Sequence, residues 1–322
     1  MDRKNLRITV IYGGISSERE VSLRSGKAVF DALQRCGYRQ VSLFDLTRDS
    51  LKNLLSNPMD LAVLALHGKG GEDGCVQGML ELAGIPYTGS SVEASAVCMD
   101  KIRTKQLIDY AGLPTPRFEQ FHRSRGFDVP QMAEMIKERI GLPVVLKSPC
   151  EGSSIGVIIV KEEKDLSNAI FDIFSYGDAL LAEEFIDGVE LTLPILGNKE
   201  PTVLPIIEIT SKNEFYDYEA KYTQCMCHHL IPARISEEDI KQVNEIGKTA
   251  YQTIGCEGLA RIDFILDREK GPMLIEINTL PGMTEMSLFP DSARYNGISF
   301  EELVDKIVCL ALERTEKKRE KT

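Results

Sequence analysis

The sequence predicts an α/β protein of more than one domain, with an α+β organisation in its C-terminal two thirds. The chain has 322 residues, of which 43% are hydrophobic and 27% are charged. This length exceeds that of one typical domain, and this composition is typical of a folded globular protein. Short apolar runs alternate with helical spacing over the first hundred residues, as in βαβ units. Beyond them, short strands are separated by tight turns, which favours antiparallel pairing.

The charge and the apolar patterning exclude several classes of protein. The chain carries 49 acidic and 38 basic residues, and its formal net charge is -11. Such a chain does not suit the broad phosphate contacts of nucleic-acid-binding proteins. Its apolar runs are too short to span a membrane, and Arg3, Lys4 and Arg7 are not followed by the apolar h-region of a secretory signal. We therefore expect a cytoplasmic protein that binds neither nucleic acid nor membranes, with eight reduced and mostly buried cysteines.

The first predicted unit is a strand followed by a helix. Residues 7–12 are mostly apolar and end at a pair of glycines. Ser17 and Glu20 have the spacing of a capping box, which predicts that a helix begins there. Apolar residues continue at helical spacing to Cys36, and Gly37 suits the C-terminal cap.

Two further strands are predicted in the same region. Residues 41–46 and 61–66 have strand patterns, and the second run is almost purely apolar, as expected in a parallel sheet that is covered on both faces. Helices after each strand would complete a βαβ pattern. The prolines in residues 113–116 are incompatible with a helix and indicate a connection between modules.

The remaining elements favour antiparallel hairpins. We expect a helix over 129–140, then strands at 144–147 and 157–160 around a glycine and serine turn at 151–156. More strands follow, with a long loop around 212–231, a helix capped by Ser236, and a hairpin over 259–278. These changes in the pattern of strands and helices along the chain predict domains over residues 1–99, 100–186 and 187–322.

The hairpin over 259–278 carries the most informative polar pattern. Side chains alternate along a strand, so Arg261 and Asp263 share one face, and Glu276 and Asn278 share a face of the second strand. Two carboxylates and an amide then converge, which charge repulsion disfavours unless a cation lies between them. Such an oxygen-rich set suits Mg²⁺. A solvated polar face is the alternative that this pattern leaves open.

A second polar segment follows a predicted strand that ends at Lys147. The next residues, up to Gly156, are rich in glycine and serine, so a lysine and several backbone N–H groups could hold a polyphosphate. The segment lacks the Gly-Lys-Ser/Thr ending of a Walker A loop. A plain hairpin turn explains the residues equally well.

A third segment, residues 67–74, lies between a predicted strand and a helix. Its glycine spacing differs from G-x-G-x-x-G, and Glu72 and Asp73 would repel a pyrophosphate, so we reject a nicotinamide cofactor. His67 and Glu18 each follow a strand, at the edge where open α/β sheets bind ligands. Their structural alternatives are a packed histidine and an acid in the first turn of a helix.

Residues 225–229 contain two cysteines and two histidines within five positions. Structural zinc sites instead take their ligands from two separated pairs. We therefore interpret this segment as an ordinary connection from a loop to a strand.

Ordered motifs along nearly the whole chain carry a resemblance to a known family. They are Gly13–Ser22, His67–Gly74, Ile85–Gly89, Met99–Lys101, Glu151–Ser154, Asp217–Tyr222, Ala260–Phe264 and Glu276–Thr284. In this order they resemble the D-alanine-D-alanine ligases of the ATP-grasp superfamily. The resemblance implies an ATP-grasp fold preceded by a Rossmann-like N-terminal domain, with ATP held between the central and C-terminal domains.

The resemblance also implies an activity and its cofactors. In this family ATP phosphorylates the carboxylate of a first D-alanine, and the amine of a second D-alanine attacks the acyl phosphate. The dipeptide then enters peptidoglycan synthesis. ATP and Mg²⁺ or Mn²⁺, with two ions, are the implied cofactors, and a homodimer is an expectation from the family alone.

The resemblance assigns the nucleotide and metal contacts by motif. The implied magnesium ligands are Asp263, Glu276 and Asn278. The implied phosphate-binding lysines are Lys101, Lys147 and Lys221, and Ser154 is a further implied cofactor-binding residue. The implied adenine hinge is Glu183, Glu184 and Ile186, with Glu190 at the ribose.

On the substrate side, the resemblance assigns two amino-acid subsites. Glu18 would anchor the first ammonium, supported by Ser153 and Tyr222. The tetrahedral oxyanion would be stabilised by Arg261 and the backbone N–H of Gly282. The residues implied for the second carboxylate are Ser287 and Leu288, with His67 beside them.

One position departs from the family and another bears on the substrate. Most relatives place proline directly after the phosphate-binding lysine, whereas here the order is Lys147-Ser148-Pro149. Tyr222 matches the family, and relatives that use D-lactate differ in that loop, so D-alanine is the expected second substrate.

Two alternative functions stay open. One is a related ligase that makes D-Ala-D-Ser or D-Ala-D-Lac, and the other is a non-catalytic nucleotide-binding regulator. The regulator is disfavoured because every aligned motif position carries a chemically competent side chain.

Overall fold

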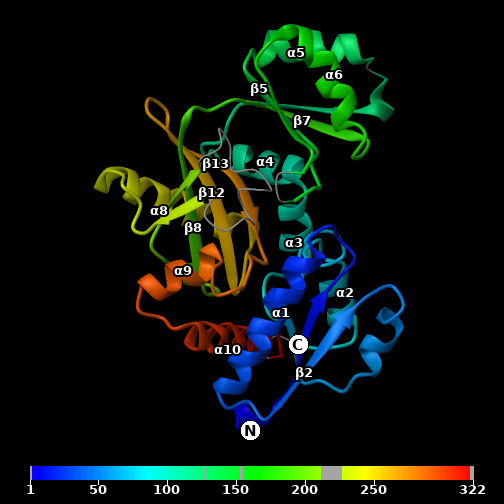
Figure 1. Ribbon diagram of the computed structural model, residues 1–322, viewed down its shortest axis with the longest axis vertical. Helices are drawn as coiled ribbons and strands as arrows, with labels where there is room; N and C mark the ends of the chain where they lie inside the picture. The colour runs from blue at the N-terminus through cyan, green and yellow to red at the C-terminus, as the bar shows by residue number, and fades with distance from the viewer. Residues whose placement is uncertain (1, 127, 153–154, 212–226, 320–322) are drawn as a thin grey trace.

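The computed structural model describes residues 2–126, 128–152, 155–211 and 227–319. These residues form a three-stranded sheet (β2-β1-β3), a four-stranded sheet (β4-β7-β5-β6) and a six-stranded sheet (β11-β10-β8-β12-β13, with β9 paired to β8). Figure 1 shows the sheets arranged along the long axis of the molecule, with the six-stranded sheet between the other two. The predicted α/β class is confirmed.

The N-terminal sheet is parallel, as predicted. Its strands are β1 (Arg7–Gly13), β2 (Gln40–Leu46) and β3 (Leu61–Leu64). The strand β3 ends before Leu66, and its ladder continues only through the Ala65 N–H, which donates to the Ile11 carbonyl at 2.9 Å. The helices nearby are α1 (Arg19–Arg35), α2 (Cys75–Leu82) and α3 (Val92–Met99).

The start of α1 differs from the prediction. The N-cap is Glu18, and its side chain makes no capping hydrogen bond, so the capping box of Ser17 and Glu20 is wrong. The Ser16 hydroxyl instead accepts the Glu18 N–H at 3.2 Å and donates to the His67 carbonyl at 2.7 Å. The helix therefore begins where the chain is bonded to the end of β3. At the other end, Gly37 adopts φ 83°, as its predicted capping role requires.

The connection between β2 and β3 also differs from the predicted pattern. It contains only the 3-10 helix η2 (Leu51–Ser56), not an α-helix. The Ser50 hydroxyl donates to the Asp45 carbonyl at 2.7 Å and closes a tight turn directly after β2. This turn and Pro58 leave space for only a short helical segment before β3.

The central part packs two helices on the four-stranded sheet (Figure 1). Its elements are α4 (Lys101–Tyr110), β4 (Phe118–His122), α5 (Val129–Arg139), β5 (Val144–Lys147), β6 (Val157–Val160), α6 (Glu163–Ile173) and β7 (Ala179–Glu184). The antiparallel hairpin of β5 and β6 is confirmed at its predicted bounds. The Ser148 N–H donates to the Gly156 carbonyl at 2.7 Å, a hydrogen bond that a proline at this position could not make.

The C-terminal part contains the six-stranded sheet. Its strands are β8 (Gly188–Leu196), β9 (Thr202–Val203), β10 (Ile207–Ser211), β11 (Cys227–Leu230), β12 (Leu259–Asp267) and β13 (Gly271–Asn278). Its helices are α8 (Glu237–Ile254), α9 (Leu288–Tyr295) and α10 (Phe300–Arg319). The Ser236 side chain caps α8 as predicted, because its hydroxyl accepts the Asp239 N–H at 3.1 Å.

Two details of this sheet refine the sequence predictions. The long loop predicted at 212–231 includes β11, because residues 227–230 pair with the edge of β10. The hairpin of β12 and β13 is confirmed, but its register shifts after Asp263. Asp263 pairs with Glu276 and the next pair is Phe264 with Leu274, so Ile275 is the extra residue of a β-bulge.

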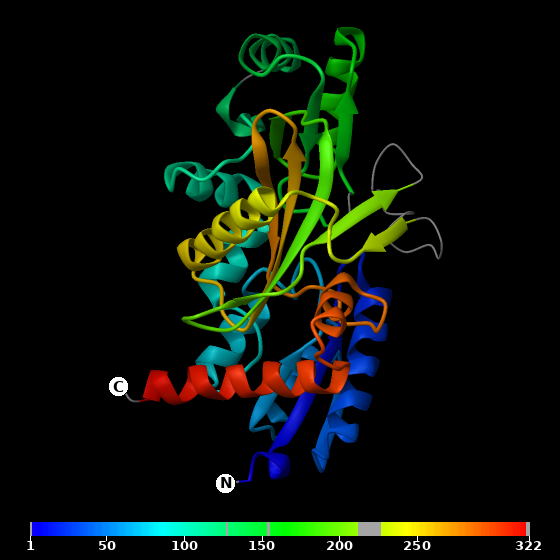
Figure 2. The same cartoon turned by 90° about the vertical axis from the view of Figure 1, so that its left-hand side faces the viewer.

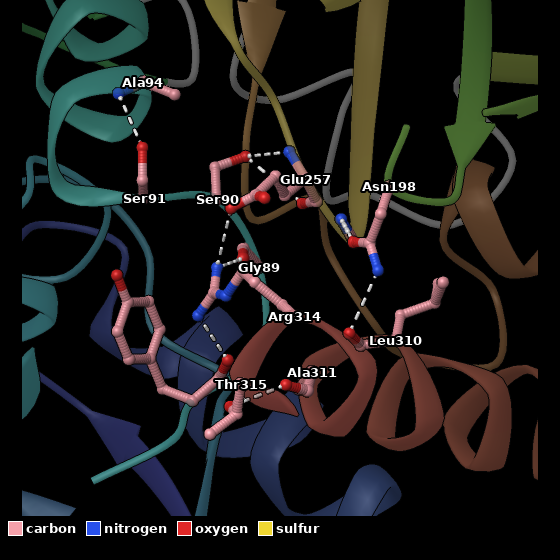
Figure 3. A network of polar contacts seen from close by, with 12 residues as sticks. Gly89, Ser90, Ser91, Ala94, Asn198, Glu257, Leu310, Ala311, Arg314 and Thr315 are labelled. Carbon is pink, nitrogen blue, oxygen red and sulfur yellow. Dashed lines mark hydrogen bonds and ion pairs between the residues drawn. The ribbon is translucent and has the colours of Figure 1, made fainter. Parts of the chain in front are cut away.

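The last helix packs against the first part of the chain. Figures 1 and 2 show α10 lying beside α1, and both helices contribute to one hydrophobic core that includes Val10, Leu33, Val304 and Val308. A polar network extends this contact (Figure 3). The buried Arg314 guanidinium donates to the carbonyls of Tyr87 and Gly89. The division of the chain after residues 99 and 186 stays a prediction.

The cysteines differ from expectation. Among the residues that the structure describes, six cysteines are free, and only Cys98 and Cys256 are buried. The prediction of mostly buried thiols is wrong, because Cys75 and Cys150 lie exposed beside surface turns. No helix in the described ranges is long and apolar enough to cross a membrane.

Candidate active site

A cavity of about 450 Å³ lies where the N-terminal part, the hairpin of β12 and β13, and the start of α9 meet. Its walls include many of the residues that sequence reasoning selected. These are Glu18, His67, Lys101, Arg261, Glu276, Asn278, Gly282, Ser287 and Leu288. Glu151 and Gly152, from the loop after β5, also line it. Residues from widely separated segments of the sequence therefore line one cavity.

The polar face of the hairpin forms one hydrogen-bonded group. Arg261 binds Asp263 through both carboxylate oxygens, with Nε at 2.9 Å from Oδ1 and Nη2 at 2.7 Å from Oδ2. The Thr192 hydroxyl donates to Asp263 Oδ1 at 2.5 Å, and the Asn278 amide donates to Oδ2 at 3.2 Å. Glu276 is the cross-strand partner of Asp263. The predicted convergence of two carboxylates and an amide is confirmed.

This donor set fits a hard divalent cation in its chemistry. Carboxylate and amide oxygens are the ligands that Mg²⁺ takes in proteins. Among the described residues no group of three or more histidine, cysteine, aspartate or glutamate side chains is arranged to hold a metal. The set here has two carboxylates, from Asp263 and Glu276, and would depend on the Asn278 amide, on water and on a ligand to complete it.

Lys101 joins the loop after β5 to the hairpin. It is the first residue of α4, and its Nζ donates to the Glu151 carbonyl at 2.7 Å. The same ammonium lies 3.5 Å from Glu276 Oε2. The backbone N–H of Lys101 donates to the Pro149 carbonyl at 3.0 Å. A positive charge is thus held between the glycine-containing loop and the candidate cation ligands.

Lys147 and Glu183 lie together in the central sheet. Lys147 ends β5, Glu183 lies on β7, and their charged ends form a short ion pair. Glu183 is 2% exposed, and a second lysine, Lys105, lies 2.9 Å from its Oε1. Burial acts to raise the pKa of Glu183, but the two lysines outweigh it and hold this pKa below its usual value. Glu183 is therefore a carboxylate at neutral pH.

The other hinge and ribose candidates follow β7. Glu184 pairs with Arg117 at 3.1 Å and also with Lys270, so two surface cations hold its carboxylate. Ile186 is buried, and Glu190 is half-buried on β8, where its register partners are β-strand isoleucines. The described residues that line the 450 Å³ cavity include none of these three.

Glu18 and His67 also line the cavity, and both are buried. His67 Nδ1 lies 3.1 Å from the Leu280 carbonyl, and Nε2 lies 3.4 Å from the Ser25 hydroxyl. Burial lowers the pKa of His67 although the Glu18 carboxylate acts to raise it, so the imidazole is neutral at pH 7. A Cβ at Gly152 would lie 2.6 Å from Glu18 Oε2, so a larger residue there would require the Glu18 carboxylate to shift.

The segment before α9 completes the cavity. The Ser287 hydroxyl accepts the Thr284 N–H at 3.1 Å, and Ser287 is the N-cap of α9. Leu288 is buried at the first position of that helix. A Cβ at Gly282 would lie 3.0 Å from Ser287 Oγ, which explains a glycine at this point of the turn. Ser153, Ser154, Lys221 and Tyr222 lie outside the described residues.

Comparison with known proteins identifies the family of this chain. Family models for the C-terminus and the N-terminus of D-ala D-ala ligases match residues 107–309 and 45–90. The chain belongs to the D-alanine-D-alanine ligase family. The resemblance drawn from the ordered motifs is confirmed.

Individual ligases match over almost the full chain. The D-alanine-D-alanine ligase of Carboxydothermus hydrogenoformans is 47% identical over 97% of this chain and 100% of its own length. That of Desulforudis audaxviator is 49% identical over 96% of this chain and 99% of its own length.

Solved ligase structures share the fold. The Bacillus anthracis D-alanine-D-alanine ligase complexed with ATP has a TM-score of 0.82 at 32% identity, and the match covers 97% of this chain and 99% of that one. The VanG D-Ala:D-Ser ligase of Enterococcus faecalis also has a TM-score of 0.82 at 32% identity, over 95% and 99% of the chains. The predicted ATP-grasp fold is confirmed, and the overall fold does not separate ligases by their second substrate.

Two cavity residues of this ligase were not selected from the sequence. Glu72 lines the cavity, and burial, together with the nearby Glu18, raises its pKa to about 8. Its position depends on the turn in which its N–H donates to the Gly68 carbonyl at 3.1 Å, which no periodicity reveals. His229 on β11 also lines the cavity, and its Nδ1 lies 2.8 Å from Asp291 Oδ2. Its place in a short cysteine and histidine cluster did not indicate that His229 would line the cavity.

Proposed function

We propose that this protein joins two D-alanine molecules to D-alanyl-D-alanine with ATP as the phosphoryl donor. The observation that carries the proposal is the cavity, where a buried carboxylate, Glu18, lines the same space as the cations Lys101 and Arg261 and the carboxylate Glu276. The Glu18 carboxylate suits an ammonium group, and the two cations suit a phosphorylated carboxylate. The near full-length similarity to curated D-alanine-D-alanine ligases supports the same reaction.

The reaction proceeds in two steps. The γ-phosphoryl group of ATP passes to a carboxylate oxygen of the first D-alanine, and ADP leaves. The amine of the second D-alanine, after losing a proton, attacks the acyl carbon, and the C–O bond to phosphate breaks. The peptide bond and inorganic phosphate are the products.

Each charged residue would bind the part of the substrates whose charge is opposite to its own. Glu18 would hold the first ammonium, and Lys101 and Lys147 would offset the charge of the transferring phosphoryl group. Arg261 and the Gly282 N–H would meet the oxyanion of the tetrahedral intermediate, where each preorganised donor contributes about 3–4 kcal/mol. The neutral His67 would lie beside the subsite of the second D-alanine.

The proposal also includes a requirement for a divalent metal ion. Asp263, Glu276 and Asn278 would hold Mg²⁺ or Mn²⁺, and bound ions would neutralise phosphate oxygens. The roles assigned to Ser153, Ser154, Lys221 and Tyr222 rest on the motifs alone. The adenine and ribose contacts of residues 183–190, the homodimer and the cytoplasmic location likewise stay predictions.

The test is phosphate release by the purified protein with ATP and Mg²⁺ at neutral pH. D-alanine alone should give ADP, phosphate and dipeptide in equal amounts. Competition of D-alanine with D-serine and D-lactate should leave D-alanyl-D-alanine as the main product. Preferred use of D-lactate or D-serine would refute the proposed second substrate, and ATP binding without phosphate release would indicate a non-catalytic regulator.

A further inference from the structure

A fully buried lysine lies beneath the proposed nucleotide site. Lys105 is on α4 and its side chain is inaccessible to solvent, which is rare for lysine unless its charge is paired. Its ammonium lies 2.9 Å from Glu183 Oε1 and donates to the Thr115 hydroxyl at 2.6 Å. That hydroxyl in turn donates to the Leu274 carbonyl at 2.8 Å. No sequence motif indicated a role for Lys105.

These contacts join the two sheets between which ATP is expected to bind. Glu183 belongs to β7 in the four-stranded sheet, whereas Leu274 belongs to β13 in the six-stranded sheet. The helix α4 packs against β13, and its Lys105 reaches β7 through the ion pair with Glu183. A second hydrogen bond, from the Leu274 N–H to the Pro114 carbonyl at 2.9 Å, fixes the same connection. Lys105 therefore lies at the junction of the two sheets.

Glu183 is shared between two lysines with different surroundings. Lys147 reaches it from the end of β5, next to the loop that is expected to hold phosphate, whereas Lys105 reaches it from inside the protein. Two ammonium groups and one carboxylate leave one positive charge in excess, which suits an arriving anion. A Lys147 that turns toward phosphate would leave the buried Glu183 without this partner. Lys105 would then still neutralise it.

The Glu183 carboxylate also has capacity for a further donor. Its Oε1 makes the ion pair with Lys105, but no hydrogen bond of acceptable geometry reaches this oxygen, although it is buried. Buried acceptors are normally satisfied. An amino group such as the one on adenine would satisfy it.

We propose that Lys105 is a positioning residue of the nucleotide site, which holds the Glu183 carboxylate in place for the adenine amino group and leaves Lys147 available for phosphate. This inference rests on the proposed function, because that function places ATP between the two sheets. Lys105 itself touches neither substrate nor nucleotide in this scheme.

The first test compares Lys105→Met with wild type in steady-state kinetics. We expect KM for ATP to rise about tenfold or more, because Lys147 is then retained by the buried Glu183, while KM for D-alanine changes less than about twofold. Lys137→Met is the matched control, since Lys137 also bridges two glutamates, Glu134 and Glu163, but at the surface of α5. This control should keep the wild-type KM for ATP.

A second readout separates positioning from mere stability. ITP carries a carbonyl where ATP carries the amino group, so a well-placed Glu183 favours ATP over ITP. Lys105→Met should lower the ATP to ITP ratio of kcat/KM, whereas a purely structural role would lower the unfolding temperature and keep the ratio. Thr115→Val, which removes only the hydroxyl next to Lys105, should give a smaller change in the same direction. This milder variant serves if Lys105→Met does not fold.

The outcomes distinguish the two proposals. If the wild type makes the dipeptide but both variants keep its KM for ATP and its ATP to ITP ratio, the role of Lys105 is overturned and the ligase activity stands. If the wild type does not ligate D-alanine, calorimetric binding of ADP and IDP to the same variants still tests Lys105. Weaker ADP binding with a lower ADP to IDP ratio in Lys105→Met supports the inference, and unchanged binding overturns it.

Discussion

Replacing Arg314 by methionine should destabilise the whole protein. The Arg314 side chain is 6% exposed, and its guanidinium donates to the Tyr87 carbonyl at 2.7 Å and to the Gly89 carbonyl at 2.5 Å. It also lies 4.3 Å from the centre of the Tyr87 ring and 3.5 Å from Glu257 Oε2. Methionine has a similar length and fills most of the space. Arg314→Met therefore leaves two buried carbonyls without donors and removes the cation from the ring.

The size of the effect follows from these contacts. Each buried carbonyl left unsatisfied costs about 1–3 kcal/mol, and loss of a desolvated cation–π contact costs about 1–2 kcal/mol. The ion pair with Glu257 adds little, because the Glu257 side chain is 32% exposed and its Oε2 lies as far as 3.5 Å from the Arg314 guanidinium. We expect a loss of about 3–8 kcal/mol in the free energy of unfolding, a large share of the stability of a typical protein.

Equilibrium unfolding in urea measures this difference. The matched control is Lys306→Met, which also replaces a cationic side chain by methionine, but at an exposed position of the same helix, and should alter stability by less than about 0.5 kcal/mol. Arg314→Met should unfold at a clearly lower urea concentration than both the wild type and this control. Equal midpoints for the two variants would refute the importance of the contact between α10 and the segment Tyr87–Gly89.

Three further predictions concern the cavity. Glu276→Gln should abolish turnover and leave the circular dichroism spectrum unchanged, because it weakens a cation ligand at constant volume; wild-type rates would contradict the metal assignment. Gly152→Ala should raise KM for D-alanine several-fold, since the new Cβ would lie 2.6 Å from Glu18 Oε2, and an unchanged KM would count against Glu18 as the ammonium anchor. The raised pKa of Glu72, about 8 against an ordinary 4.5, means that the folded state retains this proton, so stability should fall as pH rises from about 4.5 to 8. Glu72→Gln should flatten this part of the plot of melting temperature against pH, and an unaltered slope would refute the raised pKa of Glu72.

Much of the local structure could be predicted from the sequence, because neighbouring residues decide it. The strands 144–147 and 157–160 and the helix after Ser236 have their predicted bounds or cap. Side-chain alternation along the hairpin brought Asp263 and Glu276 to one face, since successive Cβ atoms point to opposite sides of a strand. The Ser17 capping box failed because the start of α1 is bonded to His67, a residue distant in the sequence.

The sequence by itself determined the fold class, the polar face of the hairpin and, through its ordered motifs, the family. Only the tertiary structure decided that Lys105 is buried against Glu183, that Glu72 keeps its proton, and that α10 packs on the N-terminal sheet. The physical reason is that periodicity and capping act over a few residues, whereas burial and charge pairing depend on segments that meet only in the folded chain.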